Sequence, residues 1–322
     1  MTLYKLLRHL LGATLLLLAS AAQAQIERPV KILVGFPPGG SADVSARLIA
    51  ERMSAELKQN VYVENKPGAG GRIVAELLKN APADGGTLML APVVVPVLAP
   101  MVFAKLNYDP ATDFAPVASV ANFQFGVVVN ASHPAKTLPE LISWYRSNEK
   151  LANFGSPAPG SLPHYFGTMF ARGGGVELVH VPFSGGAPLI NALVGNQVTA
   201  GIDVIAEQVE LHRSGKLRVL ATSGAQRSPL LPEVPTATEA GLRGVEGSGW
   251  FAVYAPAKTP EATLRGLNAA INRALMAPEL RERFAKLGLE PTGGSAADLA
   301  ATMQRDRERW APVVKASGFR GD

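Results

Sequence analysis

Seven short apolar runs recur along this chain of 322 residues, and stretches with helical periodicity separate them. The runs lie at residues 30–34, 87–90, 125–129, 177–181, 199–205, 217–222 and 249–254. The helical patterns lie at residues 41–57, 71–79, 138–147, 162–172, 187–194, 207–214, 261–276, 278–286 and 296–315. Bare apolar runs that alternate with helices are typical of parallel strands buried on both faces, so the pattern predicts an α/β fold. A chain of this length, 47% hydrophobic, can bury a large core, and such chains often divide into two lobes.

The N-terminus predicts export. Lys5 and Arg8 precede an apolar stretch at residues 10–19, and Ala22-Gln23-Ala24 supplies a small-residue cleavage site. This is the pattern of a secretory signal peptide over residues 1–24. A membrane anchor is the alternative, but the apolar stretch is shorter than the roughly 18–20 residues that a span requires. We therefore expect a soluble periplasmic product that begins at Gln25.

Charge and cysteine content exclude several classes of function. The formal charge of +5 is mild, and no dense Lys/Arg block with interleaved aromatic residues occurs, so we expect no nucleic-acid partner. The chain has no cysteine, which excludes disulfides, thiolate metal sites, cysteine nucleophiles and an N-terminal lipid-modified cysteine.

The segment FPPGGSAD at residues 36–43 joins the first apolar run to a helical pattern. It resembles a phosphate-binding loop, but Ser41 stands where a P-loop needs lysine, which argues against a nucleoside triphosphate. Glycine lets backbone N–H groups approach a ligand, and Ser41 can cap the helix. A helix N-terminus can accept a small anion such as a carboxylate. An ordinary strand–turn–helix connection is the alternative.

Two further loops have the same character. FGSPAPGSLPHYFG at residues 154–167 and VPFSGGAP at residues 181–188 each join a strand pattern to a helix pattern. The three helix N-termini could converge on one anion. Asp203, near the end of another predicted strand, points at the crevice where α/β folds bind ligands, or else it caps the helix that follows.

Catalytic and metal-binding patterns are scarce. The segment G-x-S-x-G does not occur, and the histidines form no H-x-x-x-H pair, so we predict neither a metal nor a cofactor. An exported hydrolase that uses Ser156 or Ser161 with His164 is an alternative, but the sequence disfavours it because no carboxylate is placed to orient the histidine. His180, in the strand-like VELVHV, fits a packed core or edge position better than a ligand position. We expect no enzyme activity.

Several blocks together resemble one family. They are RPVKILVGFPPGGSAD, VENKPGAGG, NYDPATDFAPV, FGSPAPGSLPH, VHVPFSGGAP, SGKLRVLATSGAQRSPLLPEVPTATEAG and SGWFAVYAPAKTP. In this order they are similar to the Bug family, the periplasmic solute receptors of tripartite tricarboxylate transporters. The match covers essentially all of the chain after residue 25. A receptor that signals to a membrane partner remains an alternative to one that feeds a transporter.

The resemblance implies a monomeric, two-lobed periplasmic-binding-protein fold (Venus flytrap, type II-like), with a helix-flanked sheet in each lobe. Lobe one would comprise residues 25–124 and 248–322, and lobe two residues 125–247. A small carboxylate would bind in the cleft between them, and the partners would be the membrane subunits of the transporter. The ligand-binding residues implied by the resemblance are Phe36, Gly40, Ser41, Asp43, Ser156, Gly160, Ser161, His164, Phe183 and Asp203.

Two features of these loops bear on the ligand. None of the three contains Arg or Lys, so N–H groups, hydroxyls and water must neutralise a carboxylate, and Asp43 and Asp203 would repel it unless they turn toward donors. The chain also departs from the family's pattern in having Val93, Val94 and Val95 in place of a hydroxyl-bearing loop, and in having Phe183 in place of tyrosine. These departures suggest a ligand whose far end is apolar or aromatic.

Overall fold

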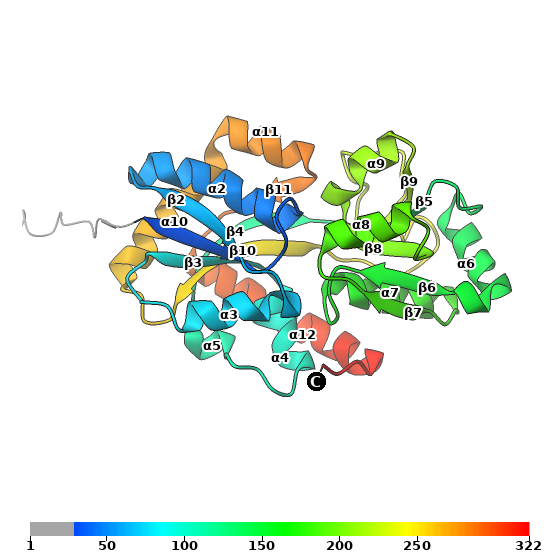
Figure 1. The fold of residues 1–322 in the computed structure, drawn as a ribbon, viewed down its shortest axis with the longest axis horizontal. Helices are drawn as coiled ribbons and strands as arrows, with labels where there is room; N and C mark the ends of the chain where they lie inside the picture. The colour runs from blue at the N-terminus through cyan, green and yellow to red at the C-terminus, as the bar shows by residue number, and fades with distance from the viewer. Residues whose placement is uncertain (1–28, 322) are drawn as a thin grey trace, which may run out of the picture.

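The structure, a computed structural model, describes residues 29–321. The predicted signal peptide lies outside the described residues. Two lobes lie side by side along the longest axis, each with one sheet flanked by helices (Figure 1). The two-lobed α/β prediction is therefore confirmed. Between residues 29 and 321, no helix is both long enough and apolar enough to cross a membrane.

Lobe one is built on a six-stranded sheet in the order β11-β4-β10-β3-β1-β2. Its strands are β1 (Val30–Val34), β2 (Val61–Asn65), β3 (Thr87–Pro92), β4 (Phe114–Phe123), β10 (Gly249–Pro256) and β11 (Leu289–Pro291). Its helices are α2 (Ser41–Leu57), α3 (Arg72–Lys79), α4 (Ala99–Val102), α5 (Pro110–Asp113), α10 (Glu261–Met276), α11 (Pro278–Lys286) and α12 (Ala296–Ser317).

Lobe two is built on a five-stranded sheet in the order β7-β6-β8-β5-β9. Its strands are β5 (Phe125–Asn130), β6 (Asn153–Ser156), β7 (Val179–Pro182), β8 (Ala200–Val204) and β9 (Leu217–Thr222). Its helices are α6 (Leu138–Ser147), α7 (Leu162–Gly174), α8 (Gly186–Val194) and α9 (Val209–Arg213).

Both sheets are mixed, which corrects the expectation of parallel strands. In lobe one, β10 runs antiparallel to β3 and β4, and in lobe two β5 runs antiparallel to β8 and β9. The chain enters lobe two between β4 and β5 and returns to lobe one on β10. The apolar runs in the sequence indicate which residues are buried but not the direction of each strand. The direction follows from the two crossings of the chain between the lobes.

Local sequence signals set many of the helix ends. The Thr137 hydroxyl accepts the N–H of Glu140 at the start of α6. Ser295 and Asp298 form a reciprocal capping box at the start of α12, and Gly318 ends that helix with a φ of 68°. Side-chain acceptors satisfy N–H groups that have no partner inside the helix, and glycine adopts the left-handed conformation without a steric cost.

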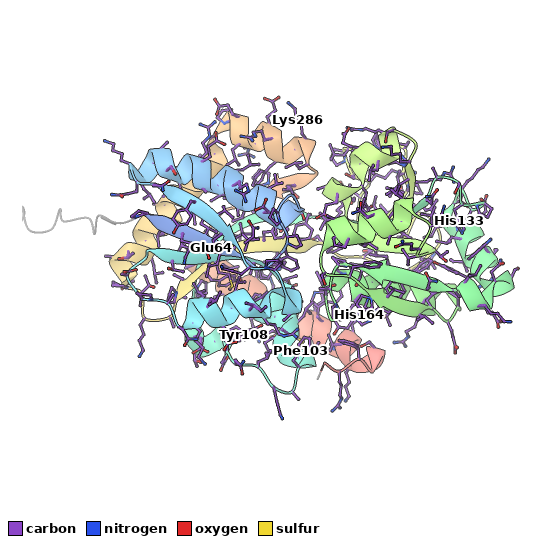
Figure 2. All side chains as sticks on the ribbon, viewed as in Figure 1. Glu64, Phe103, Tyr108, His133, His164 and Lys286 are labelled. Atoms are coloured by element: carbon purple, nitrogen blue, oxygen red, sulfur yellow. The ribbon has the colours of Figure 1, made fainter. Side chains whose placement is uncertain are left out.

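Helix α12 belongs to lobe one but also contacts lobe two. The Trp310 ring packs edge-on against Phe166 of α7, with 5.8 Å between the ring centroids. Just beyond the helix, Phe319 packs edge-on against His164 at 4.7 Å. Figure 2 labels His164 on the side of lobe two that is nearest to lobe one, and His133 near the far end of lobe two. Aromatic contacts therefore join the lobes outside the strands that connect them.

Candidate functional site

A cavity lies between the two lobes and is partly open to solvent; water-sized spheres can be centred in about 80 Å³ of it. Its enclosed part therefore suits a small molecule rather than a polymer. Residues of both lobes line it: Phe36, Pro37, Gly40, Ser41, Ala42, Pro92, Val93, Val94, Phe123, Phe125, Pro157, Ala158, Ser161, Leu162, Pro163, Gly186, Ala187, Asp203, Val204, Glu207 and Phe251.

The first turns of three helices contribute to this lining. Residues 40–42 come from the start of α2, residues 161–163 from the start of α7, and residues 186–187 from the start of α8. First-turn N–H groups have no acceptor within their own helix, and each helix N-terminus carries a partial positive charge. The lining contains no Lys, Arg or His side chain. Backbone N–H groups are thus the main source of positive potential in the cavity.

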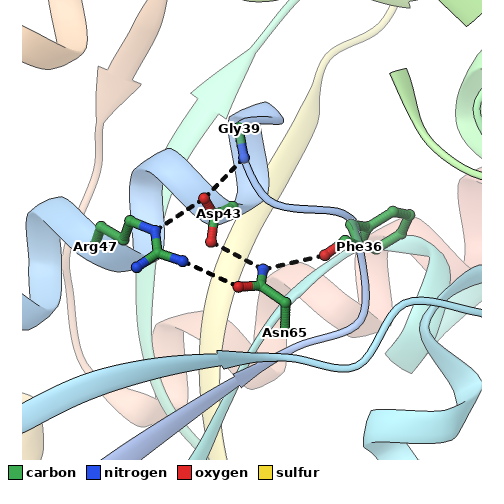
Figure 3. A network of polar contacts seen from close by, with 5 residues as sticks. All are labelled: Phe36, Gly39, Asp43, Arg47 and Asn65. Carbon is green, nitrogen blue, oxygen red and sulfur yellow. Dashed lines mark hydrogen bonds and ion pairs between the residues drawn. The ribbon is translucent and has the colours of Figure 1, made fainter. Parts of the chain in front are cut away.

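Asp43 does not line the cavity; it braces the loop that does. Its carboxylate accepts hydrogen bonds from Gly39 N (2.9 Å), Arg47 Nε (2.9 Å) and Asn65 Nδ2 (2.8 Å) (Figure 3). Asn65 also donates to the carbonyl of Phe36, so the network ties both ends of the loop to β2. Burial raises the pKa of Asp43, but these hydrogen bonds outweigh burial and hold the pKa below its usual value.

The loop before α7 is held by its own hydroxyls. The Ser156 and Ser161 hydroxyls both donate to the carbonyl of Ala158, at 3.1 and 2.6 Å. Ser161 lines the cavity, whereas Ser156 is fully buried beneath it. Gly160 has a φ of 69° and donates its N–H to Nδ1 of His164 at 3.1 Å. Ser156, Gly160 and His164 therefore position this loop and do not themselves line the cavity.

His164 and His180 stack face to face under this loop, with ring centroids 3.9 Å apart and 12° between the ring planes. Nε2 of His180 forms a hydrogen bond with the Ser156 hydroxyl at 2.7 Å. Burial lowers the pKa of His164 to about 4. Burial and the neighbouring His164 lower the pKa of His180 to about 3. Both rings are neutral at pH 7.

Two carboxylates do face the cavity. Asp203 is the penultimate residue of β8 and is 2% exposed. Its Oδ1 accepts the N–H of Val204 at 2.7 Å, and its Oδ2 has no hydrogen-bond partner. Glu207, which sequence reasoning missed as a site residue, follows in a 3-10 turn (Ile205–Glu207). Burial raises the pKa of both groups, and the charge of Glu207 raises that of Asp203 further.

The rest of the cavity wall is apolar. Val93 and Val94 line it, together with the aromatic residues Phe123, Phe125 and Phe251, which the sequence did not single out. Phe183 is not part of this lining; its ring packs over Gly155, where an added Cβ would lie 2.8 Å from it. Of the ten predicted residues, the cavity thus brings together Phe36, Gly40, Ser41, Ser161 and Asp203. Their role in binding stays a prediction.

Among residues 29–321, no group of three or more His, Asp or Glu side chains is arranged to hold a metal ion. The arrangement that the site does offer is one suited to an anion: helix N-termini at one side of an apolar cavity. Asp203 adds an acceptor that is without a partner.

Comparison with known proteins places this site in context. The family model described as "Tripartite tricarboxylate transporter family receptor" matches residues 45–319. The structure of R. palustris Rpa4515 with adipate is similar to this chain, with 34% identity, a TM-score of 0.88, and coverage of 91% of this chain and 98% of that one. MatC (Rpa3494) from Rhodopseudomonas palustris with bound malate has 35% identity, a TM-score of 0.84 and coverage of 89% and 99%. The periplasmic binding protein BugD has 31% identity, a TM-score of 0.87 and coverage of 92% and 99%.

Proposed function

The chain belongs to the tripartite tricarboxylate transporter receptor family, and we propose that it captures a small carboxylate in the periplasm and delivers it to the membrane subunits of such a transporter. The ligand would bind in the cavity between the lobes. One observation carries this proposal: the starts of α2, α7 and α8, drawn from both lobes, line a single cavity that has no basic side chain. The backbone N–H groups and partial positive charge of helix N-termini suit a small anion.

The similar proteins support a carboxylate in particular. Two of them are structures with adipate and with bound malate, which are both dicarboxylic acids. Another is described as a periplasmic binding protein, which agrees with the export signal expected at the N-terminus of this chain. We propose on these grounds that at least one carboxylate of the ligand meets the N–H groups of the cavity.

We propose binding without catalysis. The Ser161 hydroxyl donates to the Ala158 carbonyl, and Ser156, whose hydroxyl contacts His180, is fully buried and does not line the cavity. His164 uses Nδ1 to accept the Gly160 N–H. A hydrolase would need a serine hydroxyl that donates to a histidine which a third group orients. The contacts of these residues support positioning of the loop instead.

Calorimetry on the exported protein tests the proposal. Mass spectrometry of what the protein releases on denaturation would identify a candidate acid, which is then titrated beside its amide or methyl ester. We expect the acid to bind and the neutral derivative to bind far more weakly, because the derivative lacks the charge that the N–H groups accept. Equal affinity for the acid and its ester would refute carboxylate recognition.

A further inference from the structure

Glu207 reaches across the cleft from lobe two to lobe one. One carboxylate oxygen, Oε1, accepts hydrogen bonds from both the backbone N–H and the hydroxyl of Ser41, each at 3.0 Å. Ser41 is the first residue of α2, so this carboxylate lies on the positive end of that helix. A side chain of the protein thus occupies one of the three N-termini that a ligand anion would use.

The other oxygen of Glu207 lies against a second helix N-terminus. An added Cβ on Gly186, the first residue of α8, would stand 1.5 Å from Glu207 Oε2 and 2.6 Å from Asp203 Oδ2. Only a residue without a side chain leaves room for both carboxylates there. Glu207 therefore contacts the starts of α2 and α8, while the start of α7 remains without an internal carboxylate.

The balance of charge in the cavity limits what else can enter. Each helix N-terminus carries the equivalent of roughly half a positive charge, so three offer about one and a half. The negative charge of Glu207 offsets about one unit of this positive charge. No basic residue lines the cavity to add further positive charge. Asp203, buried with a free Oδ2, would add repulsion rather than relieve it whenever it is ionised. The remaining positive potential suits one carboxylate, not two.

We propose that Glu207 is a specificity-determining residue: it fills the α2 N-terminus as an internal carboxylate and limits the ligand to one carboxylate on an apolar body. This inference rests on the proposed function. The ligand carboxylate would meet the start of α7 at Ser161 and Leu162. Its apolar body would lie against the apolar wall defined by Val93, Val94, Phe123, Phe125 and Phe251. A second carboxylate would have to displace Glu207 into this apolar surface.

Hexanoate and adipate test the proposal, because they share a six-carbon chain and differ by one carboxylate. Both are titrated by calorimetry into the wild-type protein, Glu207→Ser and the same-size variant Glu207→Gln. The matched control is Glu210→Ser, which removes the same charge from an exposed position outside the cavity. We expect the wild type and the control to prefer hexanoate by about 10- to 150-fold, the value of one hydrogen bond to a charged group. Both Glu207 variants should shift this preference toward adipate by about tenfold or more.

The outcomes separate the two proposals. If the acids bind but the hexanoate-to-adipate ratio is the same in all four proteins, Glu207 does not determine specificity, and the proposed function stands. A wild-type protein that binds adipate as tightly as hexanoate also overturns the inference. If neither acid binds any of the four proteins better than hexanamide does, carboxylate binding itself fails and the inference fails with it.

Discussion

Buried carboxylates in this protein differ in the donors that they meet. Asp43 and Asp203 are each 2% exposed. Asp43 receives three hydrogen bonds and its pKa falls below the usual value, whereas Asp203 receives one, from Val204, and its pKa rises through burial and the charge of Glu207. Both carboxylates would repel a ligand carboxylate unless they turn toward donors. In the structure both oxygens of Asp43 accept hydrogen bonds, whereas only Oδ1 of Asp203 does.

Replacing Asp43 by Asn should therefore destabilise the protein at pH 7. The charge-assisted bonds to Arg47 and Gly39 weaken, and we expect a loss of about 1–3 kcal/mol in the free energy of unfolding. Because the pKa is lowered on folding, this contribution is present above pH 3.8 and is lost as the pH falls through the folded pKa. Urea unfolding at pH 7 and at about pH 2 measures it, because the loss occurs below pH 3.8. Equal stability of Asp43→Asn and wild type at pH 7 would contradict the role of this network.

The stacked histidines should make the fold sensitive to acid. The pKa values of about 4 for His164 and about 3 for His180 lie below the unfolded value of 6.5. At a pH between the folded and unfolded values, the unfolded chain therefore binds more protons than the folded protein does. Stability therefore falls as the pH drops below 6.5, by about 2 kcal/mol per histidine at pH 5. In the variant His164→Asn with His180→Gln, the amides preserve one hydrogen bond each and do not titrate. Its unfolding free energy should fall less than that of the wild type between pH 7 and pH 5; a parallel fall would exclude the pair as the cause.

At the scale of the elements, helix boundaries were more predictable than strands. The predicted limits of α2, α6, α10 and α11 agree with the structure, because helical periodicity marks them locally. Strands β2, β4 and β11 were missed. Strand β2 has a partly exposed edge pattern, and β4 contains Pro116, which makes a sequence look unlike a central strand. In the structure β4 pairs antiparallel with both β10 and β11.

The three loop-to-helix junctions were visible in the sequence because each combines small residues with a helix start. Glu207 was not, because the sequence placed it inside a helix at residues 207–214. In the structure it ends a 3-10 turn, and α9 begins only at Val209. Its partner Ser41 is 166 residues away, and no local pattern encodes a contact between lobes.

Ser161→Ala tests the start of α7 as a binding element. We expect the affinity for the carboxylate ligand to fall by about tenfold, because the variant loses the hydrogen bond to the Ala158 carbonyl that orders the loop at the start of α7. Calorimetry measures the change. Ser143→Ala is the control, since its hydroxyl also donates to a backbone carbonyl, that of Pro139, on α6, which does not line the cavity. Unchanged affinity in Ser161→Ala would remove this residue from the site.

For the whole molecule, the double crossing of the chain defines where the lobes can hinge. The first connection lies between Phe123 and Phe125, and the second lies just before Gly249, close to the positions expected from the sequence. The residue limits of the lobes stay a proposal. Contacts between Ser41 and Glu207 hold the cleft from within, whereas Trp310 and Phe166 join the lobes through α12 and α7.

Small-angle scattering should reveal the motion that this arrangement predicts. Hinge closure brings two rigid lobes together around a ligand, so saturation with the ligand should lower the radius of gyration. Because Glu207 links the lobes without any ligand, the free wild-type protein should already be partly closed. Free Glu207→Ser should then be more extended than free wild type and should compact more on binding, while Glu210→Ser should match the wild type.

If all three proteins have the same radius of gyration with and without ligand, neither the hinge nor the Glu207 link operates. If only the ligand changes the radius, equally in all three, the hinge stands and Glu207 does not close it.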